Sequence, residues 1–211
     1  MKTNDYRCPI LKGYGNINIL KKALLSKIKI KHKRAKNIYS LISLNNSEYR
    51  NDFMKCYDNK CAYCGISRRI IDENQFEIDH FIPKNLKNEN TNSINNLVLS
   101  CYNCNRKKGD FMPDENILHP DKLSLQDIFV RDDDFYIAIS DKYKNNKNIK
   151  NFYNQLKFNS DKRRIDFILM YMNELITVLE TQRKFKKNNE ILDKLRAISD
   201  SLREKRCCIE Y

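Results

Sequence analysis

Two C-x-x-C pairs constrain the fold of this chain more than any other feature. Cys61 and Cys64 form one pair in the run Cys-Ala-Tyr-Cys-Gly, and Cys101 and Cys104 form the other in Cys-Tyr-Asn-Cys. Each pair can supply two thiolates from one tight turn, with Gly65 relieving the backbone after the first, and four thiolates suit the tetrahedral coordination of zinc. We therefore predict a closed zinc site that joins two distant stretches of chain. It is expected to be structural, because four protein ligands leave no position for water.

The remaining cysteines lack metal-ligand spacing. We interpret them as ordinary thiols of a reducing compartment: Cys8, Cys56, Cys207 and Cys208. No apolar run is long enough to span a membrane, and residues 1–5 do not resemble the start of a secretory signal. The sequence thus predicts a cytoplasmic protein that does not contact a membrane.

The chain is strongly basic, with a formal net charge of +13 over 211 residues. Such an excess favours a polyanionic partner, with nucleic acid ahead of an anionic membrane surface. The richness in Lys, Asn and Ile, with four Gly, is also what AT-biased coding produces, which weakens this inference. The densest positive run, Lys27–Arg34, is either a solvated helix face or a surface that contacts phosphates.

Periodicity divides the chain into three regions. Residues 1–57 form a basic helical region, with helix-like apolar spacing over 18–44 and Ser47 as the N-cap of a further short helix. Residues 58–112 hold nearly all the residues suited to chemistry. Residues 113–211 are mainly helical, apart from an alternating strand-like run at 135–139. There Ser160 or Asp161 caps a long helix, Asn188-Asn189 interrupts the pattern, and a last helix follows.

The middle region reads as a hairpin followed by a helix. Phe76–Phe81 and Leu97–Leu99 are strand-like, and the polar, Asn-rich stretch 85–96 between them reads as a long loop. A short helix is expected to begin near Asn105. The predicted fold class is therefore α+β.

Polar residues between the cysteine pairs suggest more than a binding module. Asp79 and His80 place a carboxylate beside an imidazole at the end of the first strand, Asn96 opens the second strand, and Asn105 follows the last zinc ligand. Glu77, two residues before Asp79, is assigned a surface or structural role. A carboxylate beside an imidazole is a pair that catalysis can use, so these residues favour an enzyme over a binding module.

Here the sequence resembles the HNH endonuclease superfamily. The resemblance covers Cys61 to about Asp110 and rests on three runs in order, C-A-Y-C-G, E-I-D-H-F-I-P-K and N-N-L-V-L-S-C-Y-N-C-N-R-K-K-G-D. It implies a small ββα-metal core, braced by the zinc site and flanked by the helical regions. It also implies hydrolysis of phosphodiester bonds, in DNA ahead of RNA.

The resemblance implies a role for each polar residue. Asp79 and Asn105 would bind the catalytic ion, His80 would be the general base, and Asn96 would hold the hairpin loop and orient the imidazole. Asn at both later positions departs from forms that end in His, and its oxygen-rich donor set favours Mg²⁺ or Mn²⁺.

Each of these residues also has a plainer interpretation. His80 could be a half-buried structural histidine, Asp79 could only orient His80, Asn96 could be a turn residue and Asn105 a helix cap. Four flanking cations are expected to hold the phosphate backbone without reading bases: Lys84, Arg106, Lys107 and Lys108.

A second resemblance concerns the order of the regions. A basic N-terminal region, an HNH core and Arg-bearing C-terminal helices are similar to small HNH nucleases of Septu-type and retron-type bacterial antiphage systems, which work beside an ATPase. This implies an effector nuclease whose C-terminal helices dock on that partner. Two alternatives stay open: a zinc-braced nucleic-acid-binding module without catalysis, and an interaction subunit in which the C-terminal helices matter most.

Overall fold

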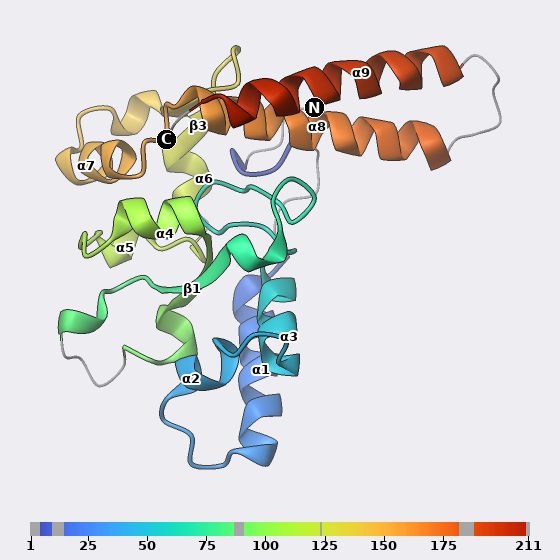
Figure 1. Ribbon diagram of the computed structural model, residues 1–211. Coiled ribbons are helices and arrows are strands. Elements are labelled where there is room, and N and C mark those ends of the chain that lie inside the picture. The colour runs from blue at the N-terminus through green and yellow to red at the C-terminus, as the bar shows by residue number, and fades with distance from the viewer. Residues whose placement is uncertain (1–4, 10–14, 87–90, 123, 182–187, 210–211) are drawn as a thin grey trace.

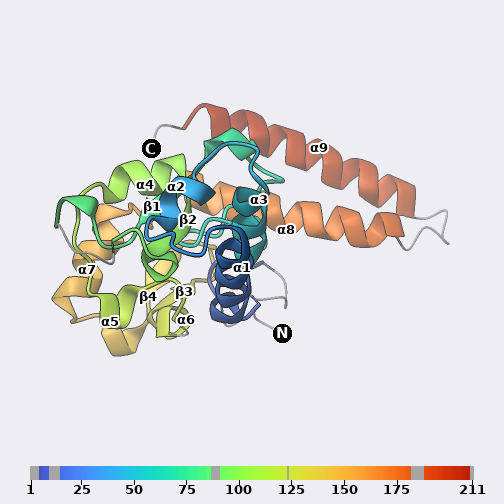
Figure 2. The same cartoon turned by 90° about the horizontal axis from the view of Figure 1, so that it is seen from below.

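The computed structural model describes residues 5–9, 15–86, 91–122, 124–181 and 188–209. Helices and two small antiparallel sheets alternate through these residues, which confirms the predicted α+β class. Figures 1 and 2 show a body built around the β1–β2 hairpin, from which a helical hairpin extends.

Three helices form the N-terminal region: α1 (Ile17–Lys31), α2 (Ile38–Ile42) and α3 (Glu48–Cys56). α1 and α3 pack side by side, and α2 lies next to β1 (Figure 1). Ser47 caps α3 as predicted, since its hydroxyl accepts a hydrogen bond from the Arg50 amide at 3.0 Å.

The helix-like spacing over 18–44 is divided between two helices rather than one. The division falls in the cationic segment 31–36, where neighbouring like charges disfavour a continuous helix. Asn37 then starts α2, because its side chain accepts from the Ser40 amide at 3.2 Å.

The middle region is a hairpin followed directly by a helix. β1 (Phe76–His80) pairs antiparallel with β2 (Leu97–Cys101), and α4 (Tyr102–Lys108) packs against both strands (Figure 1). The helix begins before the predicted start at Asn105, so Cys104 and Asn105 both lie on it. This element order is the expected ββα arrangement.

The loop between the strands is polar and contains two short 3₁₀ turns, Lys84–Leu86 and Ile94–Asn96. The predicted loop over 85–96 therefore has local order at both ends. Residues 87–90, in its middle, lie outside the described residues.

The C-terminal region starts with short elements: α5 (Glu115–Leu118), α6 (Ser124–Ile128), β3 (Phe129–Arg131), β4 (Ile137–Ile139), a 3₁₀ turn (Asp141–Tyr143) and α7 (Lys147–Gln155). β3 pairs antiparallel with β4. The strand predicted at 135–139 is shorter than expected, because Phe135 has a φ of +68° and lies in the turn before β4.

Two long helices complete the chain, α8 (Asp161–Thr181) and α9 (Asn188–Cys207). They lie side by side and extend away from the body in both views (Figures 1 and 2). Asn188 and Asn189, which were expected to interrupt the helical pattern, are instead the first two residues of α9. Residues 182–187 lie outside the described residues.

One hydrophobic core joins the three regions. Ile28 of α1, Leu97 of β2 and Phe152 of α7 are all fully buried in the same cluster. The hairpin is therefore held between helices from both ends of the chain, which fixes where its polar residues can point.

Candidate active site and zinc centre

The four predicted zinc ligands meet at one buried point. The sulfur atoms of Cys61, Cys64, Cys101 and Cys104 all lie within 4.8 Å of one another. Cys64 Sγ is 3.9 Å from Cys101 Sγ, close to the separation of about 3.8 Å that two sulfurs adopt around tetrahedral zinc. This cluster is compatible with zinc binding, as predicted.

Local backbone contacts build this cluster. The Gly65 amide donates to the Cys61 carbonyl at 2.9 Å and closes the first knuckle, while the Ala62 amide donates to Leu99 of β2 at 2.8 Å. Gly65 has a φ of +81°, and a Cβ there would lie 2.2 Å from the Arg7 carbonyl oxygen. The glycine is therefore required twice, by its left-handed backbone and by the close approach of residues 5–9.

Strand β1 directs alternate side chains to different helices, as the pleat of a strand requires. Glu77 and Asp79 contact α4, whereas His80 contacts α2. α4 and α2 lie on either side of β1 in Figure 1. The carboxylate and imidazole that are adjacent in sequence thus have different surroundings.

Asp79 is buried and both of its oxygens have partners. Tyr63 donates its hydroxyl to Oδ2 at 2.6 Å, and the Lys108 ammonium lies 3.1 Å from Oδ1. Lys108 also donates to the His80 carbonyl at 2.9 Å. Burial raises the pKa of Asp79, while the Lys108 charge and both hydrogen bonds oppose that shift.

His80 is 8% exposed and its imidazole has two neighbours. Nε2 lies 2.9 Å from Asn92 Oδ1, and the Tyr39 ring packs against the imidazole with 4.5 Å between centroids. Burial lowers the pKa of His80; the Asn92 hydrogen bond opposes this, and the charges of Lys84 and Lys108 add to it. The ring is therefore neutral near pH 7, which is the state a general base needs.

Asn96 ties the two ends of the hairpin loop together. Its Oδ1 accepts from the Ile82 amide at 2.8 Å, and its Nδ2 donates to the carbonyls of Ile82 at 3.0 Å and Thr91 at 2.9 Å. These bonds hold the loop, and the residue that contacts the imidazole is Asn92.

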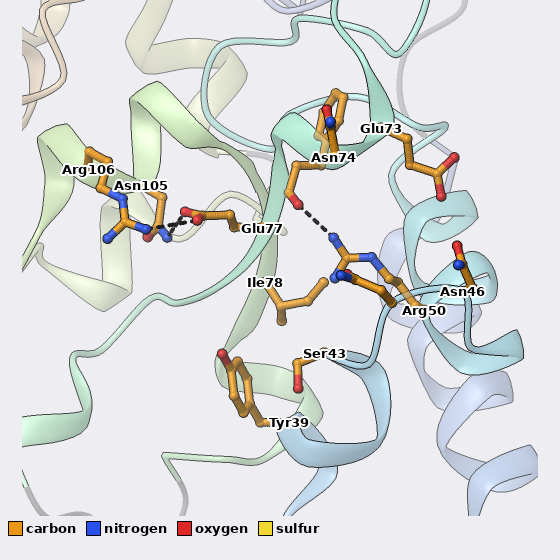
Figure 3. A pocket seen from close by; sticks show the side chains of 12 residues that line it. Tyr39, Ser43, Asn46, Arg50, Glu73, Asn74, Glu77, Ile78, Asn105 and Arg106 are labelled. Atoms are coloured by element: carbon orange, nitrogen blue, oxygen red, sulfur yellow. Dashed lines mark hydrogen bonds and ion pairs between the residues drawn. The ribbon is translucent and has the colours of Figure 1, made fainter.

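Asn105 and Arg106 pair with Glu77 rather than with Asp79. Asn105 Nδ2 lies 2.5 Å from Glu77 Oε2, and Arg106 Nη2 lies 2.9 Å from Oε1 (Figure 3). Glu77 thus links β1 to two neighbouring residues of α4. Its alternation with Asp79 along β1 is the sequence signal that places both carboxylates against α4.

The donor types predicted for the catalytic ion suit Mg²⁺ or Mn²⁺, but their arrangement does not form an open cation site. Both Asp79 oxygens are engaged by Tyr63 and Lys108, and the Asn105 amide faces Glu77. A divalent ion at Asp79 would have to displace a buried ammonium. The ligand roles of Asp79 and Asn105 accordingly stay predictions.

The four predicted phosphate-binding cations differ in exposure. Lys84 is exposed and its ammonium lies 3.9 Å above the Tyr39 ring, and Arg106 is exposed beside Tyr102. Lys107 is half-buried. Lys108 is 1% exposed and bonds to Asp79, so its ammonium faces the interior rather than the surface that the predicted phosphate contact requires.

The basic run Lys27–Arg34 lies at the C-terminal end of α1 and just beyond it. Lys27 is engaged by Asp52 and Glu48 of α3. Lys29, Lys31, Lys33 and Arg34 are exposed. The end of α1 therefore presents several cations to solvent, as a phosphate-contacting surface requires.

A polar groove of about 810 Å³ adjoins β1. Figure 3 shows it between the Glu77–Asn105–Arg106 cluster on one side and Tyr39 and Ser43 of the α2 segment on the other. Arg50 forms part of its wall and donates to the Phe76 carbonyl at 2.6 Å. Tyr39 lines this groove and also packs on His80, which is not itself among the lining residues.

Comparison with known proteins agrees with this geometry. The family model described as HNH endonuclease matches residues 61–111, from the first zinc-knuckle cysteine to just past α4. The match confirms the HNH resemblance of this segment and supports a nuclease-type function and an interaction with nucleic acid. Searches of curated proteins and of solved structures gave no significant match. Within the described residues, no helix is long and apolar enough to cross a membrane.

Proposed function

We propose that this protein is an HNH endonuclease that hydrolyses phosphodiester bonds in nucleic acid, DNA ahead of RNA, with His80 as general base. The observation that carries the proposal is the environment of the His80 imidazole. It lies within the matched segment, its pKa is lowered chiefly by burial, and the Asn92 bond at Nε2 leaves Nδ1 to accept a proton.

The proposed reaction starts with water beside the substrate phosphate. His80 takes the proton of that water as its oxygen attacks phosphorus, and the bond to the leaving oxygen breaks while that oxygen takes a proton from solvent. Lys84 and Arg106 are exposed near the imidazole and the groove, where they can hold the phosphate backbone. No step is assigned to a divalent ion, because both Asp79 oxygens are already engaged by Tyr63 and Lys108.

We further propose, on the resemblance alone, that the protein acts in the cytoplasm as an antiphage effector beside an ATPase partner. The feature that supports a docking role is the α8–α9 hairpin. It extends from the body (Figures 1 and 2) and carries exposed apolar side chains at Val178, Ile191 and Ile198. Such side chains are suited to a protein interface.

The test is cleavage of supercoiled plasmid by the purified protein with Mg²⁺, with Mn²⁺ and with EDTA. His80→Ala should lower the rate by about 10²- to 10⁴-fold, the usual contribution of a general base. His32→Ala is the matched control, since His32 is exposed at the end of α1. Nicking that His80→Ala loses and the control keeps is the expected result, and equal rates for the two variants would exclude His80. The Mg²⁺, Mn²⁺ and EDTA reactions report whether a divalent ion is required.

The alternative is a zinc-braced module that binds nucleic acid without cutting it. The Lys108 ammonium favours this alternative, because it contacts the Asp79 oxygen at which the resemblance implies a metal ion. Salt-dependent binding without cleavage of DNA or RNA, in any metal and with the partner present, would support it.

A further inference from the structure

The hydrogen bond between Asn92 and His80 determines which ring nitrogen carries the proton, as well as the position of the ring. Asn92 Oδ1, 2.9 Å from Nε2, is a carboxamide oxygen and can only accept, so Nε2 must carry the hydrogen. In a neutral imidazole the lone pair is then on Nδ1. Among the described residues no hydrogen bond reaches Nδ1, so that nitrogen is the one left for a reacting water.

Asn92 is itself held from two directions. Its carbonyl accepts from the amide of Ile38, the first residue of α2, at 3.2 Å. The preceding carbonyl, of Thr91, accepts from Asn96 at 2.9 Å. Asn96 thus reaches His80 indirectly, by fixing the loop that carries Asn92.

Helix α2 completes the arrangement from outside the HNH segment. Tyr39 follows Ile38 directly and places its ring 4.5 Å from the imidazole centroid. Lys84, from the hairpin loop, lies over the same tyrosine ring. One helix therefore contacts both the residue that bonds Nε2 and the face of the ring, which leaves the imidazole little freedom to turn.

We propose that Asn92 is a positioning residue for the hydrolysis proposed above: it holds His80 in the Nε2–H tautomer and aims Nδ1 at the reacting water. The inference rests on the proposed function for its purpose. The tautomer itself is a property of the folded chain and can be observed without substrate.

The test is the tautomer of His80, read from two-dimensional ¹H–¹⁵N spectra of ¹⁵N-histidine-labelled full-length protein at pH 8. The chain has three histidines, so His80→Ala and His119→Ala assign the signals. The wild-type His80 signal should have the Nε2–H pattern. Asn92→Ala should show a mixture of tautomers, while Asn92→Asp, whose carboxylate also accepts from Nε2, should keep the wild-type pattern.

Asn95→Ala is the matched control, because Asn95 is in the same loop with an exposed side chain. An unchanged His119 signal, with a cooperative thermal transition, reports that each variant is folded. If Asn92→Ala does not fold, Asn92→Ser removes the same acceptor with a smaller change in polarity. A wild-type tautomer in the folded alanine or serine variant would overturn the proposal.

Cleavage kinetics give the second readout. In an active enzyme Asn92→Ala should lower kcat by about 10- to 100-fold, the cost of a misplaced catalytic group, and leave KM unchanged. Asn92→Asp should recover much of kcat, and Asn95→Ala should match wild type. If no nucleic acid is cut, the proposed function fails, yet the spectra still decide whether Asn92 sets the tautomer.

Discussion

Asp79 and His80 are neighbours in the chain, yet the Asp79 carboxylate bonds Lys108 of α4 and the His80 imidazole packs on Tyr39 of α2. One lysine nevertheless joins them, because Lys108 donates to both the Asp79 side chain and the His80 carbonyl. The end of β1 is therefore fixed through an ion pair buried under the hairpin. The orientation of the imidazole is fixed separately, by α2 and the loop.

The Lys108–Asp79 pair should be strongly coupled. Lys108→Met removes the cation from the Asp79 carboxylate, which is 6% exposed. Breaking a buried ion pair in this way costs about 3–5 kcal/mol. The double variant Lys108→Met/Asp79→Leu should recover part of that loss, since it removes both charges. Urea unfolding of the single and double variants measures the coupling. Lys107→Met is the control on the same helix, and equal losses for Lys107 and Lys108 would contradict the role of the pair.

Cleavage should lose rate as the pH falls. Burial lowers the pKa of His80 from its ordinary value of 6.5, so the imidazole stays neutral and able to accept a proton down to somewhat below that pH. The rate should therefore be flat above about pH 7 and fall only below pH 6.5. A profile of kcat/KM against pH measures this limb. A limb centred well above pH 7 would show that another group is the base.

Fold stability should also decrease in acid, for a reason that involves a second histidine. Burial lowers the pKa of His119 below 6.5, and its Nε2 lies 3.1 Å from the Asn95 carbonyl oxygen. The unfolded chain then binds more protons than the folded chain, so stability is lost as the pH falls from the unfolded pKa toward the folded one. Thermal melting between pH 8 and pH 5 tests this. His119→Gln should flatten the dependence, and His32→Gln should not.

Gly65 should tolerate no side chain. Gly65→Ala adds a Cβ that meets the Arg7 carbonyl at 2.2 Å, on a residue with φ +81°. The left-handed backbone alone costs about 1–2 kcal/mol, and the clash adds to it. Gly15→Ala is the control without either feature, since Gly15 has no positive φ and its nearest neighbour, Leu20 Cδ1, is 3.9 Å from the added Cβ. Denaturant unfolding should show a clear loss for Gly65→Ala and little change for Gly15→Ala.

Local spacing explains which parts of the site the sequence could predict. The cysteine pairs, the carboxylate–imidazole pair and the ββα order depend on residues close together in the chain, and Ser47 caps a helix within one turn. The position of Lys108 near the site could also have been predicted, because Lys108 lies three residues after Asn105 and so on the same side of α4.

Long-range contacts explain what the sequence could not predict. Tyr39 reaches His80 only because α2 packs beside the hairpin, and no local pattern indicates this. Asn92 is one of several asparagines in a polar loop, and nothing in its spacing marks it as the one that bonds the imidazole. The contacts of Tyr63 and Lys108 with the Asp79 carboxylate likewise depend on tertiary packing.

Zinc should be required for folding rather than for the chemical step. The four thiols are buried at the junction of the knuckle, β2 and α4, and binding at a structural zinc site contributes about 10–16 kcal/mol in small zinc domains. That is comparable with the whole stability of a typical domain, about 5–15 kcal/mol.

Cys61→Ser or Cys104→Ser should therefore lose zinc and cooperative unfolding together. Cys208→Ser, at an exposed position, should keep both. Metal analysis by mass spectrometry gives the zinc content, and circular dichroism gives the melting. A stable Cys104→Ser variant without zinc would show that the hydrophobic core holds the hairpin without the metal.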